Sequence, residues 1–329
     1  MKRKNSDTRG CEVGKGDRWN KAAKCMPRRT GPWRIALLLL AVLYSLASPA
    51  QELTPRAYWP TPVGTNLLVF AFQNTSGDIL TDPSLPVSGV KSDLNFLQFG
   101  YQRTFNWFSR TGTIQINQPY SWGITKGFLS GQYRERKTSG IADTQIRFAI
   151  NLLGAPSMDL EAFRQLLADP KTIVGVSLLL KLPTGDYQPD KYINVGANRW
   201  GAKPAIGLIQ PIVSGLLFEF EFGAWLYGNN DEFLGQTNRQ KTIYSAEAHL
   251  VKLTRTGVWA SLDVNFYRGG RTVVDGTSQA NLQSNSRAGV TLFYPWKRRH
   301  GLRASYSTGI YTESGGDFRT LNLSYTYAW

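Results

Sequence analysis

The chain has 329 residues, with 38 Lys and Arg against 23 Asp and Glu, for a formal net charge of +15. Its first 50 residues hold 11 of the basic and 3 of the acidic side chains, so the rest carries 27 and 20, a net of +7. This small excess does not indicate nucleic acid as a partner. Both cysteines, Cys11 and Cys25, also lie in the first 50 residues, and the remainder has only His249 and His300. Disulfide frameworks and thiolate or His-rich metal sites are therefore excluded there, and we expect no metal or cofactor.

Residues 35–47 form an uninterrupted apolar run between a basic stretch and the sequence Ser48-Pro49-Ala50. This arrangement is typical of a signal peptide, here residues 1–50, with Gln51 as the first mature residue. Met26 directly precedes a shorter basic stretch and is an alternative start. An uncleaved anchor is the other interpretation, although the run is shorter than the roughly 20 residues that a membrane-spanning helix needs.

The next segment, residues 51–64, holds three prolines and two aromatic residues. We expect it to lie in the periplasm ahead of the first strand. An alternative is that it narrows the lumen, as inward-folded loops would, and leaves gaps through which small solutes pass. Beyond it the sequence alternates between apolar and polar residues, which predicts β-strands because their side-chain period is two. Twelve such strands are expected, near residues 65–75, 94–105, 111–134, 143–153, 172–183, 202–211, 215–227, 242–252, 256–267, 285–295, 301–312 and 318–329. Pro119 leaves open a division of the third strand, but an even total favours keeping it whole.

Strands of this kind occur in soluble sandwiches and in outer-membrane barrels. The export signal, the strand length of about 10 residues and the aromatic residues at strand ends, such as Trp225 and Tyr227, all favour a barrel. We therefore predict an all-β protein, residues 65–329, that forms a transmembrane antiparallel up-and-down β-barrel of about 12 strands. Its localisation would be the outer membrane of a Gram-negative bacterium, with membrane lipid as a partner.

One predicted periplasmic connection, residues 154–170, is long, whereas the other predicted periplasmic connections are short turns. Ser157 can cap a helix, an apolar stripe follows, and Pro170 would end it. The prediction is one short periplasmic helix over residues 157–168, lying at the barrel rim or, alternatively, acting as a plug or docking element.

The last predicted strand is LNLSYTYAW, which places Tyr325, Tyr327 and Trp329 on one apolar face. A final strand of this kind resembles the C-terminal signal that the barrel-assembly machinery reads. We expect this machinery to be a partner and these three aromatic residues to form the insertion signal.

Several motifs occur in order along nearly the whole predicted mature chain: AYWPTPVGTN (57–66), SGDILTDPSLPV (76–87), INLLGAPS (150–157), YINVGANRWGAKPAIG (192–207), YRGGRTVVDG (267–276) and SGGDF (314–318). With these motifs the sequence resembles the MetA-pathway of phenol degradation family, whose members are described as transporters. The resemblance implies an outer-membrane channel associated with the catabolism of aromatic compounds. It brings no agreed functional residues.

Charged residues on the polar faces of the predicted strands are expected to face the lumen, because a charge facing hydrocarbon costs about 2–4 kcal/mol for Arg at mid-depth. Acids would gather on one wall and bases partly oppose them, which gives either a transverse field or ion pairs that rigidify the barrel. The candidate lumen-lining residues are Arg103, Arg147, Glu219, Glu221, Glu247, His249, Asp263, Arg287 and Arg303.

Two chemical alternatives come from the same residues. Ser245, Glu247 and His249 share one strand face but point in parallel, which does not suit a catalytic triad. Glu219 and Glu221 could form a carboxylate pair for glycoside chemistry, but lumen carboxylates more often set the field of a pore. We therefore predict no enzyme and no catalytic residues. The expected function is passive uptake of a small, aromatic or hydrophobic solute, and the alternative is a structural or adhesive barrel whose extracellular loops bind a partner.

Overall fold

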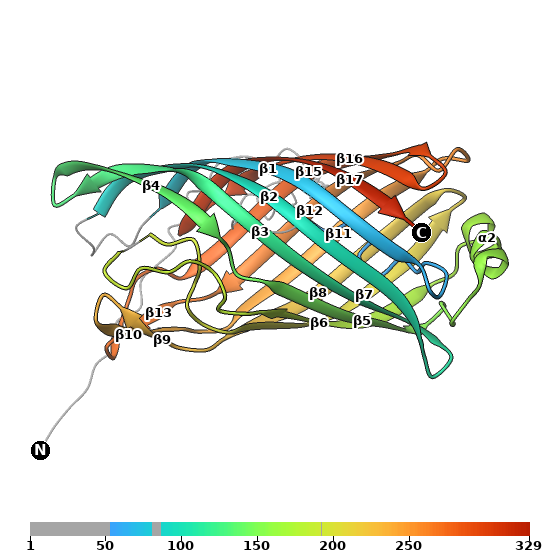
Figure 1. The fold of residues 1–329 in the computed structure, drawn as a ribbon, viewed down its shortest axis with the longest axis horizontal. Helices are drawn as coiled ribbons and strands as arrows, with labels where there is room; N and C mark the ends of the chain where they lie inside the picture. The colour runs from blue at the N-terminus through green and yellow to red at the C-terminus, as the bar shows by residue number, and fades with distance from the viewer. Residues whose placement is uncertain (1–52, 81–86, 192) are drawn as a thin grey trace, which may run out of the picture. The chain divides into compact units, whose positions relative to one another are not determined.

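The computed structural model describes residues 53–80, 87–191 and 193–329, so the predicted signal peptide and its cleavage site lie outside the described residues. A closed antiparallel barrel of twelve strands follows the N-terminal segment (Figure 1). Its strands are β1 (Asn66–Leu80), β2 (Val87–Trp107), β3 (Arg110–Leu129), β4 (Gln132–Ile141) continued by β5 (Gln145–Leu153), β6 (Ile173–Lys181), β7 (Gly201–Val213), β8 (Leu216–Tyr227), β11 (Ile243–Leu253), β12 (Trp259–Gly269), β15 (Gln283–Lys297), β16 (His300–Tyr311) and β17 (Gly315–Ala328). The predicted fold class is confirmed.

The barrel closes where the first strand pairs with both the second and the last. Leu67 of β1 lies opposite Ala328 of β17 and, on its other side, opposite Gln102 of β2. Closure removes the unpaired strand edges that hydrocarbon could not satisfy. The last strand therefore completes the barrel, as its alternating sequence indicates.

Pro119 marks a break in the wall. Strand β3 continues through Pro119, which lies opposite Gln98 of β2, but its other neighbour changes from β4 to β5 across residues 142–144. The Pro119 carbonyl accepts a hydrogen bond from the Ala142 N–H, so the proline nitrogen, which has no hydrogen, faces this break as well. The third strand is thus undivided at Pro119, as predicted, but it ends at Leu129 and not at residue 134. The chain turns there and returns as β4, which was not predicted as a strand of its own.

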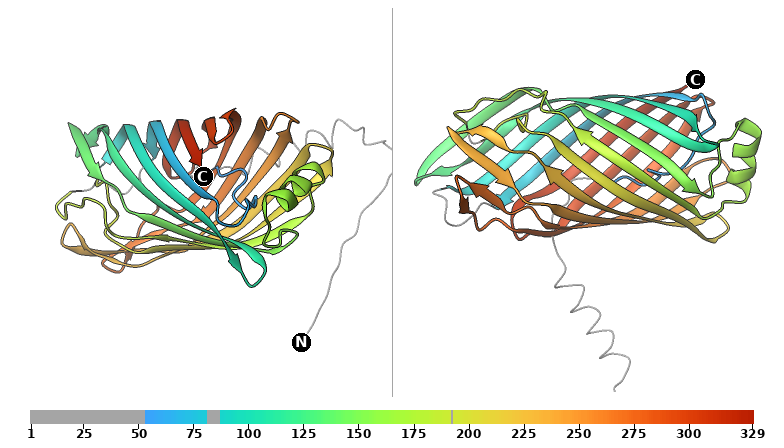
Figure 2. Two further views of the ribbon diagram at one scale, coloured as in Figure 1. Left: turned by 45° about the vertical axis from the view of Figure 1, so that its right-hand side comes forward. Right: turned by 90° about the horizontal axis from the view of Figure 1, so that it is seen from below.

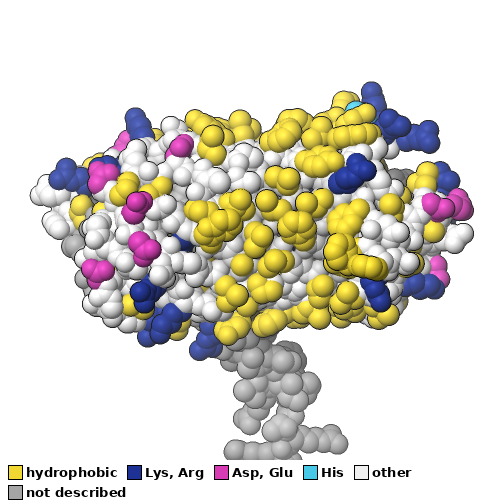
Figure 3. Space-filling model, turned by 60° about the horizontal axis from the view of Figure 1, so that its bottom comes forward, with side chains coloured by type: hydrophobic (Ala, Val, Ile, Leu, Met, Phe, Trp, Pro, Cys, Tyr) yellow, Lys and Arg dark blue, Asp and Glu magenta, His cyan; other side chains and the backbone are white. Residues whose placement is uncertain are grey.

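The outer face of the barrel carries a band of apolar side chains, with charged side chains towards both ends (Figure 3). Phe99 and Leu262 are exposed on this face, whereas their strand neighbours Gly100 and Asp263 are buried inside. This alternation is the pattern of a barrel that faces lipid outside and polar groups inside. The alternating strands were correctly assigned to their two faces.

At one end of the barrel lie the C-terminus, the short turns and helix α2 (Leu160–Ala168) (Figures 1 and 2). Short turns are typical of the periplasmic end. The cap of α2 is Asp159, whose carboxylate accepts the Ala162 N–H at 2.9 Å, so the prediction of Ser157 as the cap was wrong. Of the leucines predicted to form the apolar stripe, Leu166 is buried, whereas Leu160 and Leu167 are exposed. Among the described residues, no helix is long and apolar enough to span a membrane.

The opposite end carries the long loops, two of which form a small sheet of their own. Its strands are β9 (Asn230–Phe233), β10 (Gln236–Gln240), β13 (Thr272–Val274) and β14 (Thr277–Ser278). The loop after β6 is anchored by the buried carboxylate of Asp143, which accepts the N–H groups of Gly185 at 3.0 Å and Ala197 at 2.9 Å. The sequence predicted these segments as loops, and the structure shows that they are ordered by specific pairings.

Candidate functional site

The N-terminal segment enters the barrel and binds acidic side chains of its inner wall. The N–H of Arg56 donates to Oε2 of Glu219 at 2.6 Å, and the N–H and hydroxyl of Thr54 donate to Oε2 of Glu247 at 3.3 and 3.1 Å. The prediction placed residues 51–64 in the periplasm ahead of the barrel. The structure places residues 54–58 inside it, in contact with buried groups of the wall.

Wall side chains also donate to the carbonyl groups of this segment. Arg303 donates to the Pro55 carbonyl at 2.9 Å, Arg147 to that of Ala57 at 3.0 Å and Asn151 to that of Tyr58 at 3.1 Å. A segment that contains prolines cannot form a regular ladder with the wall, because each proline lacks a donor. These side-chain donors supply the hydrogen bonds that the segment's backbone would otherwise lose.

Tyr58 fixes the segment against the wall through a slot made by two glycines. A Cβ built on Gly175 would lie 2.5 Å from Cδ1 of Tyr58, and one built on Gly207 would overlap the ring. The Tyr58 hydroxyl is 2.9 Å from the Ser177 hydroxyl, and the guanidinium carbon of Arg147 lies 4.9 Å from the ring centroid. Only residues without side chains leave room for the ring here, so the wall is shaped to receive this aromatic residue.

The middle of the interior is a layer of paired charges. Lys203 of β7 contacts Glu221 at 2.7 Å and Glu247 at 3.2 Å, and Arg147 contacts Glu221 at 3.5 Å. Glu221 and Glu247 lie directly opposite each other on β8 and β11, where two carboxylates repel. The ammonium of Lys203 bridges them, and this residue was missed because a single lysine between Ala202 and Pro204 gives no clear pattern.

A second group of this layer is centred on His249. Its Nδ1 lies 2.8 Å from Oδ1 of Asp263, and Oδ2 of Asp263 accepts the Thr291 hydroxyl at 2.8 Å. Glu219 lies opposite His249 on β8, and its Oε1 is buried without a hydrogen bond among the described residues. Burial lowers the pKa of Arg56 to about 10, an effect that the Glu219 carboxylate opposes, so Arg56 is charged at neutral pH.

The charges of this layer nearly balance. Its carboxylates are Glu219, Glu221, Glu247 and Asp263, and its basic side chains are Arg56, Arg147, Lys203 and Arg303, with His249 among them. Of the two predicted arrangements, internal pairing therefore describes the layer better than a wall of acids facing a wall of bases. The N-terminal segment itself contributes one of the cations.

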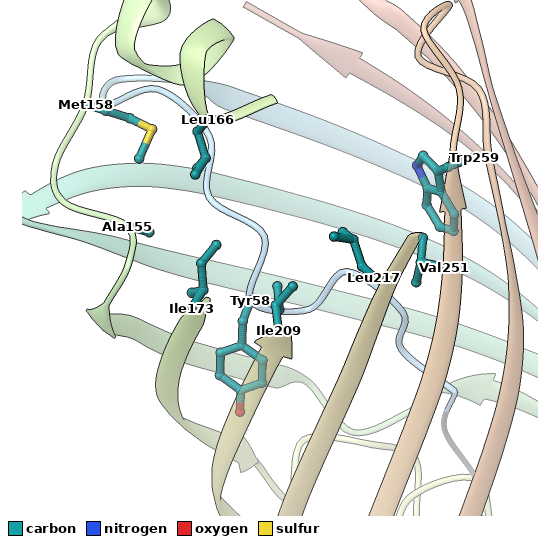
Figure 4. Packing of buried hydrophobic residues seen from close by; sticks show 9 residues of the cluster. All are labelled: Tyr58, Ala155, Met158, Leu166, Ile173, Ile209, Leu217, Val251 and Trp259. Atoms are coloured by element: carbon teal, nitrogen blue, oxygen red, sulfur yellow. The ribbon is translucent and has the colours of Figure 1, made fainter. Parts of the chain in front are cut away.

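Apolar layers lie on both sides of the charges. Towards the periplasmic end, Tyr58 packs with residues of the wall and of α2, as Figure 4 shows for Tyr58, Ala155, Met158, Leu166, Ile173, Ile209, Leu217, Val251 and Trp259. Towards the extracellular end the layer consists of Leu179, Trp225, Ile243 and Tyr267, with Tyr227 packed against it. The rings of Trp225 and Tyr227 stack with their centroids 6.1 Å apart. A solute that enters from outside would thus meet aromatic surface before it reaches the charges.

Most of the predicted lumen residues lie in the interior, but not all of them belong to one site. Arg287 is also inside, where it donates to the Phe318 carbonyl at 2.8 Å and the Thr320 hydroxyl at 2.7 Å. Arg103 is placed differently from the prediction. It is exposed on the same face of β2 as Leu97 and Phe99 and donates to Oδ1 of Asn66 at 2.9 Å. Arg103 is near the periplasmic rim, where an outward charge can reach water and headgroups.

The residues considered for catalysis are engaged in other contacts. The hydroxyl of Ser245 donates to the Gly223 carbonyl at 3.4 Å, whereas His249 pairs with Asp263. No hydrogen bond joins Ser245 to His249 in the part of the chain that the structure describes. Within that part, no group of three or more potential ligand side chains is arranged to hold a metal ion. The arrangement is that of an ion-paired lumen.

Comparison with known proteins gives the family. Residues 72–327 match the model of the family described as putative MetA-pathway of phenol degradation. The chain belongs to this family. A search of curated proteins finds no match.

Solved structures similar to this family member are outer-membrane barrels. An outer membrane channel from Pseudomonas putida F1 aligns with a TM-score of 0.69 at 20% identity, over 84% of this chain and 100% of that one. The transport unit of the autotransporter AIDA-I from Escherichia coli reaches 0.46 at 10% identity, over 90% and 97%, and the TodX monoaromatic hydrocarbon channel 0.43 at 10%, over 82% and 90%. The first similarity supports the barrel fold, and the other two are too distant to carry an argument.

Proposed function

We propose that the protein is an outer-membrane channel for passive uptake of small apolar compounds, with aromatic compounds as the preferred class. The observation that carries the proposal is the aromatic layer at the extracellular side of the lumen, formed by Trp225, Tyr227 and Tyr267 with Leu179 and Ile243. Pores for hydrophilic solutes are lined by rings of charged or polar groups. An apolar layer at this depth favours solutes that gain by leaving water. Membership of a family described by phenol degradation supports the same class.

The charged layer below is consistent with this function because its groups are paired with one another. A buried ion that has a partner is less available to bind a passing ion, and the pairs hold the wall in a fixed shape. Arg147, Glu221 and Lys203 form such a group directly beside Tyr58. The N-terminal segment therefore limits passage at this level, and a solute can cross only if the segment moves or leaves space beside it.

Uptake of a labelled aromatic compound tests the proposal. Cells that produce the protein should accumulate radiolabelled toluene or phenol faster than cells with an empty vector. Trp225→Ala should reduce this uptake, because Trp225 is buried in the aromatic layer. Trp200→Ala is the matched control, since Trp200 is 58% exposed, and it should leave uptake unchanged.

A parallel measurement separates a channel for apolar compounds from a general porin. Liposomes that contain the protein should swell slowly in sugars and amino acids. Rapid swelling, with equal toluene uptake in producing and non-producing cells, would contradict the proposal. The absence of any transport would favour the alternative of a structural or adhesive barrel, for which the ordered sheet of β9, β10, β13 and β14 offers an extracellular surface.

A further inference from the structure

The lipid-facing side of the barrel has an apolar groove that rises obliquely from the periplasmic rim. Its floor follows one row of cross-strand neighbours, in which each residue is paired with the next. The row runs through Lys252, Ala260, Leu292, Ala304, Leu323 and Phe72. Lys252 is one residue from the end of β11, whereas Phe72 lies in the middle of β1, so the row climbs from the rim into the membrane.

Two small residues make this row concave. Ala260 and Ala304 alternate with the larger side chains of Leu292 and Leu323, and the outer surface is hollowed over them. Two cavities, of about 480 and 810 Å³, lie along the row and share the residues Leu292 and Ala304. They therefore form one continuous groove, whose length suits a flexible chain better than a compact solute.

Basic side chains surround the periplasmic end of the groove. Lys252 lines the groove itself, and Arg255 follows in the next turn. The neighbouring turn carries Lys297, Arg298 and Arg299, all exposed. The two turns are adjacent, because a Cβ built on Gly257 would lie 3.4 Å from Cγ of Pro295.

These cations have no acidic neighbours in sequence. Residues 252–258 and 295–301 contain no Asp or Glu. Within the described part of the chain, the ion pairs that form involve other lysines and arginines, mainly at the extracellular end and in the lumen. A group of unpaired cations at the depth of the headgroups attracts anionic lipid, and each Lys or Arg contributes to that attraction.

We propose that this groove binds an anionic phospholipid of the periplasmic leaflet. Its phosphate would lie among Lys252, Arg255 and the cations of residues 297–299, and one acyl chain would lie along Ala260 and Ala304. The cations match the phosphate of such a lipid, and the apolar groove matches one of its acyl chains. An apolar ligand without a negative charge would not require the cations. The site is on the outer face, so this proposal stands independently of what passes through the lumen.

Native mass spectrometry of the purified protein with a defined lipid mixture tests the site. The wild type, incubated with equal amounts of phosphatidylglycerol and phosphatidylcholine of the same acyl chains, should retain phosphatidylglycerol several-fold more often. The triple variant Lys252→Gln/Arg298→Gln/Arg299→Gln should lose most of this preference, because each of these cations contributes to the attraction of anionic lipid. Ala304→Phe should reduce retention of lipid, because the ring fills the groove.

A matched variant controls for loss of charge in general. Lys126→Gln/Arg134→Gln/Lys137→Gln removes the same number of cations at the extracellular end and should keep the wild-type preference. Each variant is first shown to be folded by its heat-modifiable migration in electrophoresis. Equal retention of the two lipids by the wild type would overturn the proposal. So would an unchanged preference in the folded Lys252 triple variant, or a preference lost equally in the control.

Discussion

Replacing Gly207 by alanine tests whether the N-terminal segment occupies the lumen through Tyr58. The new methyl group would overlap the Tyr58 ring, which must then leave its slot. Truncation of a buried aromatic residue typically costs about 3–5 kcal/mol, and Tyr58 is only 5% exposed. If the free energy that favours the bound position of the N-terminal segment falls by about 3 kcal/mol, the population of its displaced state rises roughly a hundredfold.

Two assays report this displacement. Single-channel conductance of Gly207→Ala in planar bilayers should rise above that of the wild type. Because both native cysteines lie in the predicted signal peptide, a single cysteine introduced as Ala57→Cys should react faster with a thiol reagent in the Gly207→Ala background.

Gly100→Ala is the matched control. Gly100 is also buried in the wall, but a Cβ there would lie 3.4 Å from its nearest neighbour, Cβ of Val69, which needs only a small adjustment. The double variant Tyr58→Ala/Gly207→Ala should behave as Tyr58→Ala alone, since the overlap requires the ring. Wild-type conductance and labelling in folded Gly207→Ala would refute the assignment of Tyr58 as the residue that seats the segment.

Three further changes have defined outcomes. Trp329→Asp should lower the amount of assembled protein in the outer membrane, measured by fractionation and heat-modifiable migration, and normal assembly would show that the last aromatic residue carries no insertion signal. Lys203→Gln leaves Glu221 and Glu247 facing each other and should destabilise the barrel by about 3–5 kcal/mol, seen as a lower temperature of heat modification, whereas an unchanged temperature would mean that water or Arg147 replaces the ammonium. Glu219→Lys removes the acceptor of the Arg56 N–H and should raise conductance and shift selectivity towards anions, and equal selectivity in the variant and the wild type would place Glu219 outside the conducting path.

The alternation of apolar and polar side chains predicted the barrel, because this pattern depends only on neighbouring residues within each strand. Glu219, Glu247 and Asp263 are buried inside, and Leu250 and Leu262 are exposed outside, as a period of two requires. The expectation that charged side chains face the lumen failed at Arg103, because the strand approaches the rim there and an outward-facing charge no longer meets hydrocarbon. It could not identify Lys203, whose role depends on carboxylates of two other strands.

The sequence could not decide between the two positions considered for the N-terminal segment, because its position depends on contacts with residues far away in the chain. Its prolines and aromatic residues show no periodic pattern, and its partners, such as Glu219 and Arg303, lie more than 150 residues away. In the sequence Gly175 and Gly207 are ordinary strand glycines. Only the structure shows that the Tyr58 ring packs against both of them. The sequence thus indicated a lumen with charges and offered the N-terminal segment only as one alternative for narrowing it, without indicating the residues that hold it there.

Uptake by proteoliposomes tests whether the lumen conducts small aromatic compounds past the N-terminal segment, as proposed. Vesicles containing wild type, Gly207→Ala or Trp225→Ala would enclose an enzyme that oxidises phenol, and product formation would report entry of external phenol. Phenol should enter faster than in protein-free vesicles, with a further increase for Gly207→Ala and a decrease for Trp225→Ala. Entry at the protein-free rate for all three proteins would contradict the proposal.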